Sequence, residues 1–129
     1  MEINGAPVNI VDDSSSNAKA AKKAVRRFPR YPANFRLSVQ SFRPTGSLSL
    51  WGLCSELGED GISGTLTGEL NLGEVVSMEI ALPAIGSPMK LRAIVRYCDG
   101  LRHGFEFLAL SEEQRQTLHR TCVMLANAP

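Results

Sequence analysis

Two residue types that build metal and catalytic sites are scarce in this chain of 129 residues. It has three cysteines, Cys54, Cys98 and Cys122, and two histidines, His103 and His119. Their spacing matches no zinc motif, and an odd number of cysteines excludes a fully paired disulfide framework. We therefore expect no metal site, and reduced, partly buried thiols that pack as small hydrophobes.

Long hydrophobic segments are also missing. No apolar run approaches the roughly 18 residues that a membrane-spanning helix needs. The N-terminal sequence MEINGAPVNIVDDSSS is polar and acidic, without the basic leader and apolar core of a secretory signal. We expect a cytoplasmic protein that does not insert into membranes.

The signatures of common enzymes are absent as well. The sequence has no nucleophile elbow, P-loop, dinucleotide fingerprint or metal-binding helix. For His103, in the last predicted strand, and His119, in the terminal helix, a surface or edge imidazole is a better interpretation than a general base. Glu59 and Asp60 stand together at a glycine-rich corner, where a solvated turn is the usual explanation. We expect no catalytic residues and no enzyme.

Negative charge is lacking from a long part of the chain. Between Ser14 and Ser55 there are eight basic residues and no acidic one, whereas acids outnumber bases from Glu56 onward, so the net charge of +1 conceals an asymmetry. A basic half favours an anionic partner, with a solvated basic linker as the alternative. Nucleic acid is disfavoured because the eight aromatic residues (one Trp, two Tyr and five Phe) form no cluster of the kind used for base stacking.

The order of the predicted elements defines a fold. Residues 1–25 lack sustained periodicity and are expected to form a flexible tail, and residues 26–126 a single domain. Six segments alternate between apolar and polar residues, and a helix follows, with a capping box from Ser111 to Gln114. Strands joined by hairpin-length turns predict an all-β fold, a small six-stranded antiparallel β-barrel with a C-terminal α-helix. The predicted strands are residues 35–39, 48–57, 61–66, 75–82, 90–97 and 102–107.

Two apolar stripes should supply much of the core. The single tryptophan, Trp51, is expected in the core or at the barrel mouth. One stripe lies on the fourth predicted strand and the other on the terminal helix, where it should close one barrel opening: Val76, Met78, Ile80 and Leu82, then Leu118, Cys122 and Leu125.

Two short segments remain that this fold does not explain. The segment RRFPRYPAN, residues 26–34, precedes the first strand, and its prolines favour an extended backbone. Within it, Arg26 and Arg30 form the pattern R-x-x-x-R. The second segment, ELGEDG, runs from Glu56 to Gly61 at the corner between the second and third predicted strands.

This ordered pair of segments resembles the PilZ domain, a bacterial six-stranded split barrel with a C-terminal helix that binds cyclic diguanylate (cyclic di-GMP, c-di-GMP). The family's motif is R-x-x-x-R before the barrel and then [DN]-x-S-x-x-G at that corner. Later segments are similar too, namely LGEVVSMEIALP (72–83), RAIVRY (92–97) and HGFEF (103–107). The resemblance covers roughly residues 25–125.

The resemblance implies a ligand-binding site. Arginine suits c-di-GMP because its planar guanidinium can donate two hydrogen bonds at once, either to two phosphate oxygens or to O6 and N7 of a guanine. The guanidinium plane can also stack on a purine. By position, the implied contacts are Arg26 and Arg30, with Arg27 auxiliary, and Glu56, Gly58 and Gly61 at the corner.

The corner departs from the family pattern at two positions. Glu56 stands where the family has Asp or Asn, and Gly58 where it has Ser, so only Gly61 matches. One missing neutral hydrogen bond costs about 0.5–1.5 kcal/mol. We therefore expect a weakened site rather than an abolished one.

The implied function is a c-di-GMP sensor that relays messenger levels to an unidentified protein partner. The arginine segment would close over the ligand and so change the surface offered to the partner. One alternative is a PilZ-like protein-interaction adaptor that does not bind nucleotide, and a third is a small-barrel nucleic-acid binder. Either a monomer or a homodimer fits the sequence.

Overall fold

The computed structural model describes residues 27–83 and 86–128. The predicted tail, residues 1–25, and Arg26 therefore lie outside the described residues. The elements are β1 (Tyr31–Pro32), β2 (Arg36–Arg43), β3 (Gly46–Leu57), β4 (Gly61–Leu66), β5 (Val75–Ile80), β6 (Met89–Asp99), β7 (Arg102–Leu108) and α1 (Glu112–Ala126).

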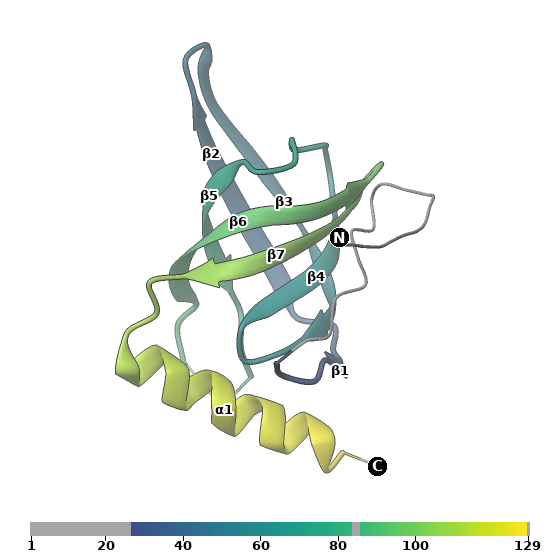
Figure 1. Cartoon of the computed structure of the whole chain (residues 1–129), viewed down its shortest axis with the longest axis vertical. Helices are drawn as coiled ribbons and strands as arrows, with labels where there is room; N and C mark the ends of the chain where they lie inside the picture. Colours follow the sequence, from purple (N-terminus) through teal and green to yellow (C-terminus); the bar gives the residue numbers. More distant parts are fainter. Residues whose placement is uncertain (1–26, 84–85, 129) are drawn as a thin grey trace, which may run out of the picture.

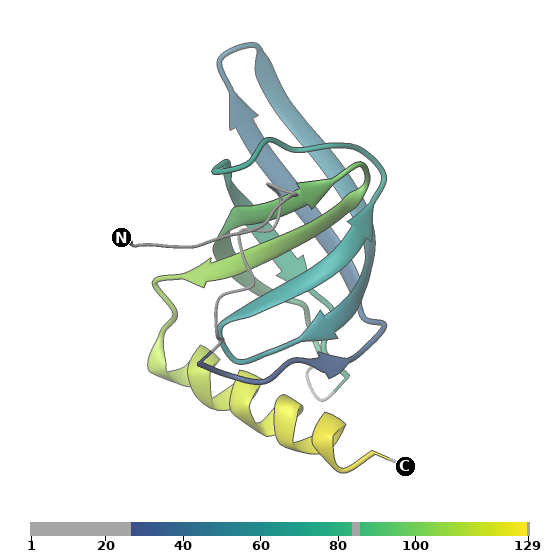
Figure 2. The same cartoon turned by 45° about the vertical axis from the view of Figure 1, so that its right-hand side comes forward.

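Strands β2 to β7 form a closed antiparallel barrel. Hydrogen bonds join them in the order β3-β2-β5-β6-β7-β4, and a further pairing of β3 with β4 closes the ring. Figures 1 and 2 show the barrel from two sides, with the β2–β3 hairpin extending beyond one end. The predicted all-β fold with six barrel strands and a terminal helix is confirmed.

The two-residue strand β1 was not predicted. Tyr31 and Pro32 pair with Leu57 and Glu56 of β3, and the amide of Ala33 donates to the carbonyl of Ser55 at 3.0 Å. A proline lacks an amide donor, so its place on a short edge strand is the expected one. These bonds fix the chain entering the barrel against β3.

The core follows from the alternation seen in the sequence. In β5 and just beyond it, every second side chain is buried, and the predicted stripe Val76, Met78, Ile80 and Leu82 is confirmed as core. Burial of such side chains stabilises the fold by about 1.5–3 kcal/mol each. All three cysteines are free; Cys54 and Cys122 are buried and Cys98 is half-buried, as expected for small hydrophobes.

Helix α1 lies across one end of the barrel (Figure 1). Its predicted capping box is present, because Ser111 accepts from the amide of Gln114 and the Gln114 side chain accepts from the amide of Ser111. Leu118 and Cys122 are buried in the core and Leu125 packs against it. The predicted closing role of this stripe is confirmed.

A polar cluster ties the β2–β3 hairpin to the turn that precedes β5. Arg43 donates to both carboxylate oxygens of Glu74 at 2.8 and 2.9 Å, and Ser41 and the amide of Asn71 donate to the same carboxylate. The hydrogen bonds from Arg43 are the main reason that the pKa of Glu74 falls to about 2. The cluster is a bidentate, well-satisfied ion pair, the arrangement in which such pairs contribute to stability.

Two sequence-based expectations are wrong. Trp51 is not packed in the core, because its side chain is 58% exposed on the outside of β3. The alternation puts Gly52 inward instead, where a Cβ would lie 1.9 Å from the carbonyl oxygen of Thr65, so no side chain fits there. Trp51, the residue before Gly52, must therefore face outward.

His103 was expected at the surface or an edge, yet it is 1% exposed. Its Nε2 accepts from the amide of Leu70 at 3.1 Å, and its Nδ1 lies 2.9 Å from the carbonyl of Leu101. These two partners fit the neutral ring with its proton on Nδ1. His103 is thus a buried structural residue that holds two loops together.

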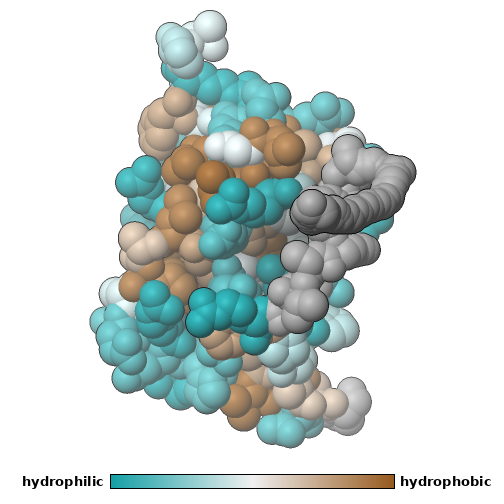
Figure 3. Space-filling model, in the orientation of Figure 1, coloured by the Kyte–Doolittle hydropathy of each residue, from teal (hydrophilic) through white to brown (hydrophobic). Residues whose placement is uncertain are grey.

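Within the described ranges, no helix is both long and apolar enough to cross a membrane. Figure 3 shows separate hydrophobic patches among hydrophilic side chains on one face of the molecule. The largest exposed hydrophobic fractions, 68% and 67%, belong to Phe42 and Leu72.

Candidate functional site

Arg30 is held at the outer edge of the barrel. It comes directly before β1, whose pairing with β3 fixes the course of the backbone. Its side chain is only 12% exposed, which is unusual for an arginine. The cause is the corner between β3 and β4, over which the side chain lies.

Gly58 provides the room that Arg30 occupies. A Cβ at position 58 would lie 2.7 Å from Cδ and 2.9 Å from Nε of Arg30, and 2.9 Å from the carbonyl oxygen of Pro29. Real Cβ atoms essentially never come closer than 3.0 Å to such neighbours. The glycine at this position is therefore required by the way Arg30 packs in this structure.

Gly61 begins β4 and meets both Arg30 and β7. A Cβ there would lie 2.3 Å from the carbonyl oxygen of Phe105 and 2.8 Å from a terminal nitrogen of Arg30. The amide of Gly58 donates to the carbonyl of Gly61 at 2.9 Å and closes the turn. Both glycines of the corner thus make close approaches that a larger residue would prevent.

Two polar side chains hold the Arg30 guanidinium in place. Its Nη1 donates to Oγ of Ser63 at 3.4 Å, and its Nε lies 3.8 Å from Oδ1 of Asp60. Asp60 belongs to the corner, and Ser63 is the third residue of β4. The positive charge of Arg30 is consequently balanced within the site by one carboxylate.

The corner also contacts the terminal helix. Glu59 accepts from Nδ1 of His119 on α1 at 2.9 Å. Burial, followed by the charges of Glu59 and Asp60, raises the pKa of the Cys122 thiol on the same helix to about 11. The two adjacent carboxylates therefore face different elements. Asp60 faces Arg30, in the segment before β1, and Glu59 faces His119 on α1.

The remaining residues predicted for the site are Glu56, Arg27 and Arg26. Glu56 is half-buried and pairs with Ser63 across β3 and β4, which puts their side chains side by side. Arg27 is exposed, with its guanidinium carbon 6.0 Å from the centre of the Phe28 ring. Arg26 lies outside the described residues.

The geometry thus brings together one half of R-x-x-x-R and the glycine-rich corner. Arg30 contacts the Gly58 and Gly61 positions, and Glu56 pairs with Ser63, whose hydroxyl accepts from Arg30. A guanidinium beside closely packed backbone is suited to an anionic ligand that carries bidentate acceptors. Among the residues described, no group of three or more side chains could hold a metal ion.

The model of the family described as "PilZ domain" matches residues 24–123. The chain belongs to the PilZ domain family. The match contains both arginines of the motif, the corner and most of α1. The PilZ barrel therefore accounts for the fold predicted from the residues. No curated protein sequence matches this chain.

Solved PilZ structures share this architecture. The PilZ domain of YcgR from Escherichia coli, solved with c-di-GMP, gives a TM-score of 0.64 at 18% identity, covering 78% of this chain and 91% of that one. MotI/DgrA, an inhibitor of motility from Bacillus subtilis, gives 0.62 at 18%, covering 83% and 55%. The MrkH–c-di-GMP complex of K. pneumonia gives 0.58 at 11%, covering 81% and 53%. The chain spans about half the length of the last two.

The sequence reasoning missed three participants. Asp60 and Glu59 were interpreted as a solvated turn, whereas Asp60 forms an ion pair with Arg30 and Glu59 accepts a hydrogen bond from His119. Ser63 was not considered. The available signal was the pair of adjacent acids inside an otherwise glycine-rich corner that follows a basic segment.

Proposed function

We propose that this PilZ domain binds c-di-GMP at the outer edge of its barrel and relays the level of this second messenger to a protein partner, without being an enzyme. Arg30 and Arg26 would be the main ligand contacts, with Arg27 auxiliary. Glu56, Gly58 and Gly61 would form the corner against which the ligand lies. We place this activity in the cytoplasm and assign the domain to residues 26–126, with residues 1–25 as a flexible tail.

One observation carries the proposal. The side chain of Arg30 lies directly on Gly58 and Gly61, so the two halves of the PilZ motif meet in one place although 28 residues separate Arg30 from Gly58. Members of the family such as YcgR have been solved with c-di-GMP. A guanidinium fixed beside closely packed backbone can donate to a phosphate or to the edge of a guanine.

Asp60 is expected to weaken this binding. Its carboxylate lies 3.8 Å from the Arg30 guanidinium and pairs with the positive charge that an incoming phosphate would need. Binding must then exchange one ion pair for another, and the pair that it gives up is partly buried, with side chains 12% and 37% exposed. The exchange lowers affinity without preventing it.

The corner offers a route from ligand to helix. Glu59 holds His119, and its neighbour Asp60 holds Arg30. A ligand that draws Arg30 away from Asp60 would change the turn and with it the contact to α1. The helix surface would then report the occupancy of the site to a partner.

Calorimetric titration with c-di-GMP tests the proposal. We expect saturable binding to the full chain and loss of binding in Arg30→Ala. Arg115→Ala, on the exposed part of α1, is the matched control and should bind as the unmodified protein does. Absence of heat at ligand concentrations up to about 100 µM, which corresponds to a binding free energy weaker than about −5.5 kcal/mol, would overturn it.

That negative result would favour the second candidate, an adaptor with the same barrel and no nucleotide. Its structural support is the compact, charge-balanced state of Arg30 over Gly58. The affinity of this adaptor for its protein partner would change neither when c-di-GMP is added nor when Arg30 is substituted.

A further inference from the structure

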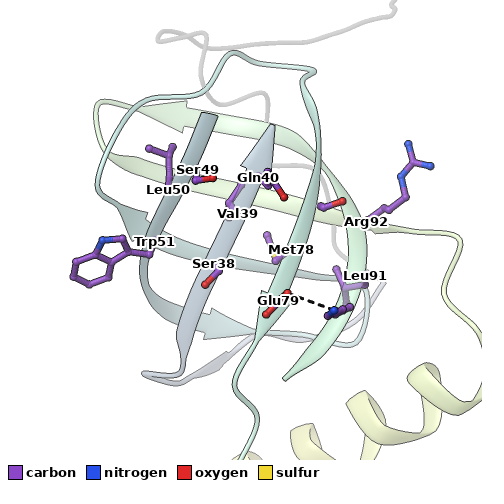
Figure 4. Close-up of a pocket in the computed structure, with 12 residues that line it drawn as sticks. Ser38, Val39, Gln40, Ser49, Leu50, Trp51, Met78, Glu79, Leu91 and Arg92 are labelled. Carbon is purple, nitrogen blue, oxygen red and sulfur yellow. Dashed lines mark ion pairs between the residues drawn. The ribbon is translucent and has the colours of Figure 1, made fainter. Parts of the chain in front are cut away.

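A hollow of about 700 Å³ lies on the outer side of β2, β3, β5 and β6, where Arg30 and the β3–β4 corner contribute nothing to its lining. Figure 4 shows its side chains. Trp51 lies at the β3 edge and points away from the barrel, and Arg92 points outward at the β6 edge. Between them, on β2, lie the shorter side chains of Ser38 and Gln40.

The strand register arranges this surface in two rows that run across the sheet. In the first row, Ser38 pairs with Trp51 on one side and with Glu79 on the other, and Glu79 pairs with Lys90. In the second row, each residue likewise pairs with the next: Ser49, Gln40, Ser77 and Arg92. Because paired residues lie directly opposite each other, each row is continuous.

Small polar residues form the floor of the hollow, and large ones stand at its ends. Ser38, Ser49 and Ser77 are exposed but short, so another chain can approach the sheet there. An exposed indole stands at the β3 end. At the β6 end, Lys90 and Arg92 are exposed, and Arg92 makes no ion pair within the described part of the chain.

The charge of the surface is positive. Its one carboxylate, Glu79, lies 3.9 Å from Lys90, which leaves the Arg92 charge available. Arg36 extends the same outer face, since it pairs with the exposed Leu53 on β3. Tryptophan and arginine are the residues most enriched among those that dominate protein interfaces.

The distance between Trp51 and Arg92 sets the length of a ligand that can contact both. Three strand intervals, about 14 Å at 4.7–4.9 Å each, separate Trp51 on β3 from Arg92 on β6, and the two residues stand in different rows, two residues (about 7 Å) apart along the strands, so the span is about 16 Å. An extended chain covers that distance in about four to five residues. A small metabolite would reach one end only. Phe42 is also exposed on the outer face of β2 but does not line the hollow, so the lining offers Trp51 alone and not the repeated stacking that single-stranded nucleic acid uses.

We propose that this face, defined by Trp51, Ser38, Ser77, Lys90 and Arg92, binds an extended acidic segment of a partner protein. An apolar side chain of the segment packs on Trp51, and a carboxylate about four to five residues away pairs with Arg92. The surface is separate from the nucleotide site, so this binding requires no c-di-GMP and stands whether or not the domain binds nucleotide.

The test selects peptides from a random display library on the full chain, without nucleotide. We expect selected peptides to carry an apolar residue and an Asp or Glu about four to five positions apart. Synthetic copies should shift the fluorescence of Trp51, the only tryptophan in the chain. In anisotropy titrations, Arg92→Glu and Trp51→Ser should each weaken binding by about tenfold or more.

The controls separate this surface from the rest of the molecule. Arg115→Glu, on exposed α1, should leave peptide affinity unchanged, as should Arg30→Ala. Both substitutions on the face are at exposed positions, and unchanged melting temperatures will show that the barrel is intact.

Four results would overturn the proposal. They are failure to select any peptide, selected peptides without an excess of acidic residues, peptide affinity of both face variants equal to that of the unmodified protein, and self-association or oligonucleotide binding that Trp51→Ser abolishes. Either form of the last result would assign the face to a second copy or to nucleic acid instead.

Discussion

Nε of Arg30 lies 3.8 Å from Oδ1 of Asp60, over a corner from which side chains are excluded at positions 58 and 61. The arginine is thereby held in the proposed site by a residue of the same chain. Because this contact uses the charge that a ligand phosphate would need, we expect Asp60 to compete with the proposed ligand for Arg30. Four predictions follow from this corner and from the polar cluster near β5.

Replacing Asp60 by asparagine should strengthen c-di-GMP binding. The substitution removes the competing charge and keeps the shape of the side chain. The gain should be about fivefold, or about 1 kcal/mol, because the pair is partly buried but its nitrogen and oxygen are 3.8 Å apart. Calorimetry measures it. Asp99→Asn, at the exposed end of β6, is the control, and weaker binding by Asp60→Asn would refute the competition between carboxylate and ligand.

Introducing the family serine at Gly58 should destabilise the unliganded protein. Its Cβ would clash with Arg30 and with the Pro29 carbonyl, and displacing a packed segment costs about 1–3 kcal/mol. Thermal unfolding with and without saturating c-di-GMP measures this cost. The deficit should shrink with ligand, because binding to the folded state alone stabilises it and draws Arg30 outward. A variant as stable as the parent without ligand would contradict the packing described.

Alanine at Gly61 should be severely destabilising. Its Cβ would lie 2.3 Å from the carbonyl oxygen of Phe105, so β4 and β7 would have to separate, at a cost of more than about 2 kcal/mol. Urea unfolding gives the free energy directly. Gly86→Ala is the matched control, since nothing lies within 4 Å of a Cβ there, and it should change stability by less than about 0.5 kcal/mol.

Glu74 should make the fold sensitive to acid. Its pKa falls from 4.5 to about 2 on folding. A carboxyl with a lowered folded pKa stabilises the fold at pH above 4.5, and this contribution is lost as the pH falls from 4.5 toward 2. Glu74→Gln should cost about 1–3 kcal/mol at neutral pH because Arg43 loses its charged, two-oxygen partner and a single neutral amide oxygen remains to accept.

Chemical unfolding between neutral pH and pH 2 measures this dependence. The difference between the parent and Glu74→Gln should narrow as the pH falls through that window. Glu69→Gln, at an exposed position, should reproduce the pH profile of the parent. A constant difference between parent and Glu74→Gln across the range would show that the carboxylate charge is not what stabilises the cluster.

Much of the fold could be predicted from the residues because its signals are local. Alternation in β5 identifies a strand with one buried face, and the Ser111–Gln114 capping box marks where α1 begins. The spacing of Arg26, Arg30 and the glycine corner was sufficient for the family. Each signal depends on neighbouring residues or on order along the chain.

The positions of single side chains could not be predicted in the same way. Residues 50–54, LWGLC, are a continuous apolar run, and either set of alternate residues could face inward. The burial of His103 involves the amide of Leu70, which is 33 positions away in the sequence and donates to its ring. The expected solvation of Asp60 was wrong because a basic side chain distant in sequence reaches it.

The sequence by itself therefore determined the strands, the helix, the barrel class and the family, since periodicity and capping act over a few residues. Tertiary structure alone decided that Trp51 faces outward, that Gly58 leaves room for Arg30, and that the carboxylate of Asp60 lies beside the Arg30 charge. These outcomes depend on how closely two strands or segments approach. Closing a barrel sets those distances, and no local pattern encodes them.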